Sequence, residues 1–451
     1  MGLIVAVAAI TLALLGSLSH TSTHDAQFDA GAPLVGGSHK PSHRRPTRTG
    51  GGASLITGAR RPALTPAEVH LQAAMTKAMN AAGPDTGALV YDVSDDSELF
   101  ALRPSVKRPP ASVEKLWTTT ALMVKLGPDE RLRTSVLGTG SLRGGVWHGN
   151  LYLRGGGDPT FGDPTFNRVW AGGYGPTASQ LGAQLLSRGI HRVTGWIYAD
   201  EGEFDKRRGG LMTNYAPDVP DFGGQLSALT YDHGTTAPHY NPATFAAREL
   251  ALVLRGSHVM VKASKHDATT PPGATMLATV SSPPMSVMTR LMDVPSDDLY
   301  AELFAKQLGV LFGRGGTISD GADVISRTIA STYGLHPTIL DGSGLSRNDR
   351  SSPLEIVDLL HELSGTAVGR QLVASLPTVG RTGTVQGIGL KTPAAGKCVA
   401  KTGTLNYVTN LAGYCHSRGG QTLAFGLFVD GPDNGTAVEL ESRMIGAIAG
   451  Y

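Results

Sequence analysis

The stretch ASVEKLW, residues 111–117, follows a rigid Arg-Pro-Pro and begins a run of helix-forming residues that ends at Gly127. Ser112 and Lys115 are three residues apart, so a helix places both side chains on one face. The first turn is the positive end of the helix dipole and disfavours a second positive charge. A neutral lysine amine beside a serine hydroxyl is an activated nucleophile. The simpler alternative is that Ser112 caps the helix and Lys115 is an exposed helix residue.

A second motif, Lys401-Thr402-Gly403-Thr404, is predicted at the end of a strand, before a turn at residues 405–407. Gly403 lets another backbone or a ligand approach the strand closely. The cation of Lys401 and the hydroxyl groups of Thr402 and Thr404 suit a substrate carboxylate. An ordinary hairpin that happens to contain a lysine is the alternative.

Two cysteines flank the predicted hairpin of residues 402–411. Cys398 and Cys415 lie on its two strands at similar distances from the tip. If the strand register pairs them, we expect a cross-strand disulfide that braces the strand of Lys401.

Composition limits the classes of function. Of the 451 residues, 41% are hydrophobic and 17% are charged, and the net charge is +2. This favours a compact, weakly charged enzyme and gives no general case for nucleic-acid binding. His361-Glu362 lacks a second histidine at the spacing of a metallopeptidase motif. We therefore predict no metal and no cofactor.

The N-terminal 62 residues are expected to lie outside the folded part. Residues 3–15 are an apolar run, shorter than the ~20 residues of a membrane span but suited to a signal peptide. We predict a signal peptide or N-terminal anchor at 1–19, although no Lys or Arg precedes the run. Residues 20–62 read as a disordered basic linker. An electrostatic tether to a membrane or the cell wall is the alternative for that linker.

The remaining pattern predicts an α+β protein, with an antiparallel sheet flanked by helices. A capping box at Thr65–Glu68 begins a helix that runs to about residue 82. Short strands and glycine turns start near residue 133 and indicate an inserted domain. We expect the main domain at 63–132 and 285–451 and the insertion at 133–284. The expected helices are 176–188, 242–255, 284–293, 297–311, 320–333, 353–364 and one from about 437; the expected strands are 86–94 and 98–104, with three more near Lys401, Asn410 and Thr422.

Five ordered segments carry a family resemblance. The segments are PPASVEKLWTTTALM (109–123), GNLYLRGGGDPTF (149–161), QLSALTYDHG (225–234), DGSGLSR (341–347) and VAKTGTLNYVTNLAGY (399–414). From about residue 65 to its end, the chain resembles the class C low-molecular-mass penicillin-binding proteins, the D-alanyl-D-alanine carboxypeptidase/endopeptidases of peptidase family S13. Their signature combines Ser-x-x-Lys, Ser-x-Asn and Lys-Thr-Gly. The resemblance implies a β-lactamase/DD-peptidase-like fold with an all-helical subdomain and one inserted β-rich domain.

The middle motif departs from the family pattern. The literal Ser-x-Asn is Ser346-Arg347-Asn348, but SDDLYAELFAKQLG (296–309) has the family's helical context, with Ser296 as the expected helix cap. Asp298 then stands where the family has Asn. An ionised Asp accepts hydrogen bonds only, so it repels a peptide carbonyl and holds Lys115 protonated. A protonated Asp298 still donates.

The resemblance also implies roles for the individual residues. Ser112 is the expected nucleophile, Lys115 its base and Ser296 a proton relay. Lys401, Thr402, Gly403 and Thr404 are expected to bind the substrate carboxylate. The expected partners are peptidoglycan stem peptides and β-lactams, and the expected location is extracytoplasmic.

Two alternatives remain for the function. The departure at Asp298 suggests a catalytically impaired protein of the same fold that binds the wall or acts as a scaffold. A β-lactamase is less favoured, because no Glu-x-x-Leu-Asn segment is placed to activate a deacylating water.

Overall fold

The computed structural model describes residues 64–234 and 240–451. The segments predicted at 1–19 and 20–62 lie outside this range. Within the described residues, none of the helices combines the length and apolar character that a membrane crossing requires.

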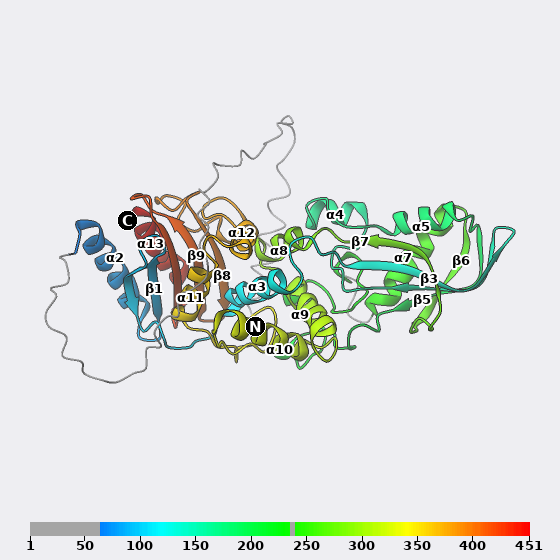
Figure 1. The fold of residues 1–451 in the computed structure, drawn as a ribbon, viewed down its shortest axis with the longest axis horizontal. Coiled ribbons are helices and arrows are strands. Elements are labelled where there is room, and N and C mark those ends of the chain that lie inside the picture. The colour runs from blue at the N-terminus through cyan, green and yellow to red at the C-terminus, as the bar shows by residue number, and fades with distance from the viewer. Residues whose placement is uncertain (1–63, 235–239) are drawn as a thin grey trace, which may run out of the picture. The chain divides into compact units, whose positions relative to one another are not determined.

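The first sheet is fully antiparallel, with strand order β2-β1-β10-β9-β8 (Figure 1). Its strands are β1 (Gly87–Asp92), β2 (Ser97–Leu102), β8 (Cys398–Leu405), β9 (Val408–His416) and β10 (Thr422–Asp430). Alternate residues point to opposite faces. On one face, Val90 and Phe425 pack in a core with α2 (Pro66–Ala82) and α13 (Asn434–Gly450). On the other face, Leu89 and Phe428 pack with α11 (Pro353–Leu363).

Helices on the α11 side of the sheet form a second layer. The layer contains the 3-10 turn η1 (Ala111–Glu114), α3 (Lys115–Lys125), α8 (Met285–Asp293), α9 (Asp298–Phe312), α10 (Ile318–Tyr333) and α12 (Ala367–Ser375). Helix α3 contacts α8, α9, α10 and α12, and residues 115–123 are all buried. Because α3 lies at the centre of this layer, the residues at its N-terminal end are fixed on several sides.

A second sheet lies within residues 133–284, with strand order β6-β5-β4-β3-β7. Its strands are β3 (Arg133–Arg143), β4 (Val146–Arg154), β5 (Arg192–Asp200), β6 (Met260–Asp267) and β7 (Thr275–Ser281). β3 is antiparallel to β4 and β7, whereas β5 is parallel to both β4 and β6. Helices α5 (Ala178–Ser187) and α7 (Pro242–Gly256) share a core with this sheet.

Shorter elements complete the fold. They are α4 (Pro164–Trp170), α6 (Val219–Phe222), η2 (Leu211–Thr213), η3 (Asp232–Gly234) and η4 (Gly383–Val385). A small core of Phe204, Phe222 and Leu226 with Leu299 and Leu303 of α9 joins the inserted segment to the helical layer.

The predicted α+β class is confirmed, as is the antiparallel sheet flanked by helices. The motif Lys401–Thr404 lies at the end of β8, which runs to Leu405 before a turn at 406–407, as predicted. One local expectation was wrong. Ser296 does not cap the next helix, because Asp297 accepts the hydrogen bond from Tyr300 N and is the N-cap of α9. The domain boundaries stay a prediction.

Candidate active site

Ser112 and Lys115 lie where η1 passes into α3. Lys115 Nζ is 3.0 Å from Ser112 Oγ. The capping alternative does not hold, because the N-cap residues of η1 and α3 are Pro110 and Glu114 and neither element has a side-chain cap. The exposed-lysine alternative does not hold either, because the Lys115 side chain is fully buried.

Glycines bring two other segments against η1. A Cβ on Gly403 of β8 would lie 2.4 Å from Pro110 O, and one on Gly344 would lie 1.9 Å from Ala111 O. Such distances are far below van der Waals contact, so only glycine fits at these positions. Ala111 itself has a φ of 48°, a conformation that costs a non-glycine residue energy. The turn that presents Ser112 is therefore held between β8 and the segment 341–347.

Lys115 has three hydrogen-bond acceptors. Its Nζ lies 3.0 Å from Ser112 Oγ, 2.6 Å from Asp298 Oδ1 and 2.8 Å from Ser343 O. A lysine ammonium carries three N–H donors, and these three acceptors take all of them. As an ammonium, Lys115 has no lone pair that could accept the serine proton. Base catalysis therefore requires that Nζ first loses a proton.

Asp298 forms an ion pair with Lys115 and is 16% exposed. Burial raises the pKa of this carboxyl, and the nearby charge of Lys115 opposes the rise. The structure thus places Asp298 beside Lys115, as the resemblance implied.

Ser296 and Lys401 form a second serine–lysine pair. Lys401 Nζ on β8 donates to Ser296 Oγ at 2.7 Å and to Thr402 O at 3.0 Å. Ser296 lies in the loop before α9 with a φ of 65°, a left-handed conformation that is costly outside glycine. Such strain concentrates at functional sites, and here it turns Ser296 towards β8 instead of towards the helix end.

Burial and, to a smaller extent, the positive charge of Lys115 lower the pKa of Lys401 to about 7. Asp293 is fully buried and accepts hydrogen bonds from Thr119 Oγ1 and Ser375 Oγ. Burial raises the pKa of Asp293 to about 6, although these bonds and the charge of Lys401 oppose the rise. The site therefore holds two buried lysines among several buried carboxyl groups, including Asp293 and Asp298, whose charges interact with them.

The remaining residues of the Lys-Thr-Gly motif follow along β8. Thr402 Oγ1 donates to Thr384 Oγ1 at 2.7 Å, and Thr404 is exposed. The β8–β9 register pairs Cys398 with Cys415, and a disulfide joins them.

The literal Ser-x-Asn at residues 346–348 does not meet the lysines. The Ser346 backbone N–H donates to Asp341 Oδ2, and its Oγ accepts from Asn348 N. Asp341 also accepts from Gly344 N, and the Glu302 carboxylate accepts from the N–H of Ser343. The bonds that the Asp341 and Glu302 carboxylates accept from backbone N–H groups fix the turn that aims Ser343 O at Lys115.

Sequence reasoning missed three contributors to the site: Ser343, Asp293 and Thr384. Ser343 acts through a backbone carbonyl, which has no side-chain signature. Asp293 and Thr384 contact the site through long-range packing. The segment DGSGLSR was recognised as family-like, and this was the one signal that pointed to Ser343.

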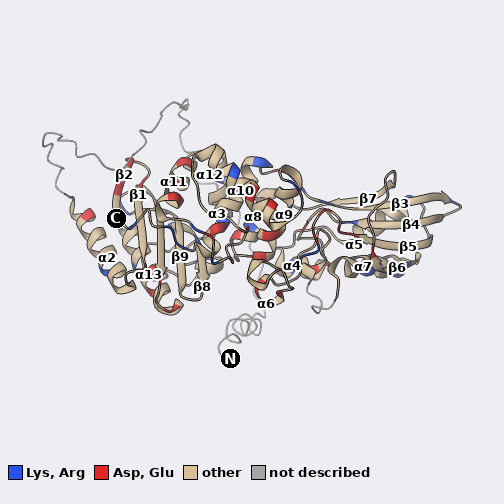
Figure 2. Cartoon of the chain, turned by 90° about the horizontal axis from the view of Figure 1, so that it is seen from below, with Lys and Arg blue, Asp and Glu red and all other residues tan. Residues whose placement is uncertain are grey.

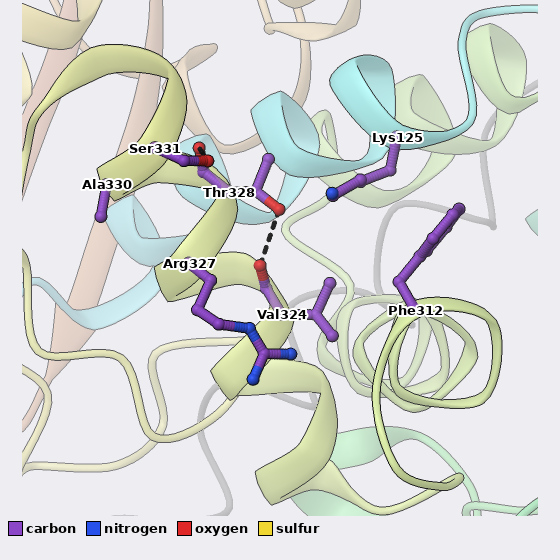
Figure 3. A pocket seen from close by; sticks show the side chains of 7 residues that line it. All are labelled: Lys125, Phe312, Val324, Arg327, Thr328, Ala330 and Ser331. Atoms are coloured by element: carbon purple, nitrogen blue, oxygen red, sulfur yellow. Dashed lines mark hydrogen bonds between the residues drawn. The ribbon is translucent and has the colours of Figure 1, made fainter.

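A hollow of about 480 Å³ lies at the other end of α3, where Lys125, Phe312 and Arg327 line it (Figure 3). Ten residues of helix separate Lys125 from Lys115, which corresponds to about 15 Å. This hollow is therefore distinct from the serine–lysine site. Among residues 64–234 and 240–451, no group of three His, Cys, Asp or Glu side chains is arranged to hold a metal.

Two buried lysines that each contact a serine hydroxyl define a class of site: acyl transfer by a serine nucleophile with a lysine base. The D-Ala-D-Ala carboxypeptidase 3 (S13) family matches the chain at residues 69–242 and 223–449. The protein belongs to this family.

Individual relatives agree with this membership. Carboxypeptidase DacB of Mycolicibacterium smegmatis is 30% identical over 399 residues, covering 83% of each chain. The D-alanyl-D-alanine carboxypeptidase of Actinomadura sp. is 26% identical over 459 residues, covering 82% of each chain. The crystal structure of penicillin-binding protein 4 from Haemophilus influenzae matches with a TM-score of 0.70 at 19% identity, covering 84% of this chain and 99% of that one. This last likeness establishes the β-lactamase/DD-peptidase-like fold.

Proposed function

We propose that this protein is a serine-type D-Ala-D-Ala carboxypeptidase/endopeptidase that cleaves peptidoglycan stem peptides through an acyl-enzyme on Ser112. The observation that carries the proposal is the pair of serine–lysine contacts, Lys115 with Ser112 and Lys401 with Ser296. Family membership supplies the reaction class. No metal or cofactor takes part in the proposed steps.

Acylation follows from this geometry. Ser112 Oγ attacks the carbonyl between the two terminal D-alanines, and Lys115, as the neutral amine, takes the serine proton. The backbone N–H groups of Ser112 and Thr404 stabilise the negative oxygen of the tetrahedral intermediate. The C–N bond then breaks, and Ser296 relays a proton to the leaving amine. D-alanine departs, and water later hydrolyses the ester on Ser112.

Substrate binding is assigned to β8. In its ammonium form, Lys401 attracts the terminal carboxylate, while Thr402 and Thr404 supply hydroxyl donors. Gly403 keeps the strand close to η1, so that the bound carboxylate lies beside the nucleophile. Because penicillins mimic the terminal dipeptide, we expect them to acylate Ser112 as well. Such a substrate places the protein outside the cytoplasm.

The scaffold alternative rests on Asp298, a carboxylate that pairs with Lys115 at the position where the family has an uncharged Asn. This contact argues for a slower enzyme and does not remove any reacting group. Relatives that align over more than four fifths of the chain are named carboxypeptidases, which favours catalysis over a scaffold role.

Release of D-alanine from a peptide that ends in D-Ala-D-Ala tests the proposal. We expect the full chain to release one D-alanine per peptide, and Ser112→Ala to lower the rate by roughly 10³-fold or more. Ser346→Ala is the matched control, because Ser346 belongs to the literal Ser-x-Asn and does not contact either lysine. Peptide binding without any release of D-alanine, or full activity in Ser112→Ala, would contradict the proposal.

A further inference from the structure

A hollow of about 720 Å³ lies on the inserted sheet, between β5 and β6. Its lining includes Arg192, Trp196, Arg255, His258, Met260 and Lys262. The β5–β6 ladder is irregular here: Arg192 pairs with Met260, and the next pair is Trp196 with Lys262. Three residues of β5 thus face one residue of β6, and this bulge coincides with the hollow.

The strand side chains Arg192, Trp196, Met260 and Lys262 point away from the helices, whereas Arg255 reaches the hollow from α7. Val193, Ile197, Val259 and Val261 are buried in the core that α5 and α7 cover. Their neighbours along the strands alternate to the opposite face. Trp196 is 44% exposed and Met260 is 60% exposed there. The Lys262 ammonium lies 5.7 Å from the centre of the Trp196 ring, which leaves a large aromatic surface beside a cation.

Among the residues that the structure describes, the cations of the hollow have no acidic partners. None of the ion pairs within residues 64–234 and 240–451 involves Arg192, Arg255 or Lys262. The sequence contains no Asp or Glu in 164–199 or in 250–266. Figure 2 shows basic residues on α7 and β6, whereas acidic residues are found near α4 and α6. The charge of the inserted segment is therefore segregated, with positive charge at the hollow.

We propose that this hollow binds an anionic polysaccharide, a chain of sugar rings that carries spaced negative groups. Arg192, Arg255 and Lys262 match the charges, since guanidinium groups bind carboxylates and phosphates in a bidentate manner. The Trp196 ring offers the flat apolar surface on which the C–H face of a sugar ring packs. From Arg192 to Trp196, the part of β5 that lines the hollow spans about 13 Å, the length of two to three sugar residues.

This site is separate from the serine–lysine centre and does not depend on the proposed peptidase activity. It gives the inserted sheet a role: to hold the protein on an acidic glycan while the other domain acts. A membrane surface is less favoured, because the cations line a hollow with an exposed indole and do not form a flat, lysine-rich face.

The test is a binding titration of the full chain with polygalacturonate, a soluble acidic glycan. We expect binding that weakens with added salt. Trp196→Ala and the double variant Arg192→Gln/Lys262→Gln should each weaken it by about tenfold or more. Lys77→Gln, which removes one exposed cation from α2, is the control and should bind as the parent does. Unchanged thermal unfolding of each variant shows that the fold is intact.

Three outcomes would overturn the proposal. The first is no binding of polygalacturonate at low salt. The second is that charge alone explains the contact. This would be shown if Trp196→Ala binds polygalacturonate as tightly as the parent does, or if it loses as much affinity for inorganic polyphosphate as for polygalacturonate. The third is tighter binding to phosphatidylglycerol vesicles through the same residues, which would assign the hollow to a membrane surface.

Discussion

Asp298 is the residue that most affects the chemistry of Ser112. Its carboxylate, at 2.6 Å from Lys115 Nζ, takes one of the three N–H donors of the ammonium. An amide at the same position would carry no charge, and its NH₂ would donate to a substrate carbonyl. The site therefore has all its reacting groups, with a carboxylate in the position where the family has an amide.

Asp298→Asn should raise the rate of acylation by a β-lactam by about tenfold, because the amide carries no charge and its NH₂ can donate to the carbonyl of the β-lactam. Stopped-flow measurement of acylation at neutral pH provides the check. Asp297→Asn is the matched control: it makes the same change one residue earlier, and Asn caps α9 as well as Asp does. A slower Asp298→Asn variant would mean that the carboxylate assists the reaction.

At the scale of elements, the site depends on the contact between β8 and η1. β8 carries Lys401 and the carboxylate-binding threonines, whereas η1 carries Ser112. The two elements meet at Gly403, where Pro110 O and Val113 N lie 2.4 Å and 3.0 Å from the position that a Cβ would take. Because both neighbours are backbone atoms, neither can move aside cheaply.

We expect Gly403→Ala to lower the free energy of unfolding by about 1–3 kcal/mol and to slow acylation, since β8 must move away from Ser112. Denaturant unfolding and acylation kinetics measure the two effects. Gly387→Ala adds the same methyl group where no atom lies within 4 Å and φ is not positive, so it should change neither. Acylation that is equally fast in both variants would show that the close approach is unnecessary.

The sequence predicted the local half of the site. Ser112 and Lys115 are three residues apart, so helix geometry alone brings them together. The contact between Lys115 and Asp298 spans 183 residues, and only the family resemblance pointed to it. The helix pattern misplaced Ser296 as a cap, because a positive φ is not visible in residue types. Ser343 could not be identified as a lysine partner for a similar reason, since any residue supplies a carbonyl.

At the scale of the whole molecule, the element types were predicted better than their pairing. The helical patterns of 176–188 and 242–255 correspond to α5 and α7. Both helices lie in connections between parallel strands, β4 to β5 and β5 to β6, and such connections require a crossover. The residues alone did not reveal these parallel pairs, because short strands with glycine turns suit either direction.

Stability of the whole fold should depend on pH through Glu441. This carboxyl is fully buried on α13, and neither oxygen has a hydrogen-bond partner among the described residues. Burial raises its pKa from 4.5 to about 8. Between these values the unfolded chain has released the proton while the folded chain retains it. The free energy of unfolding therefore falls as pH rises through this window.

Glu441→Gln removes this titration. The Tm of Glu441→Gln minus the Tm of the parent should be larger at pH 8 than at pH 5 by a few degrees. The reason is that only the parent is destabilised at the higher pH by its buried carboxyl. Calorimetry of both proteins at the two pH values makes the comparison, and the contributions of all other titrating groups cancel. A Tm difference that is the same at pH 5 and pH 8 would rule out a protonated Glu441.

The central claim is that Ser112 is the nucleophile, and intact-protein and peptide mass spectrometry after incubation with a penicillin tests it most directly. We expect one adduct of the mass of the drug, located on the peptide that contains Ser112 and absent from Ser112→Ala. An unmodified protein, or an adduct located on Ser296 or Ser346, would contradict the account.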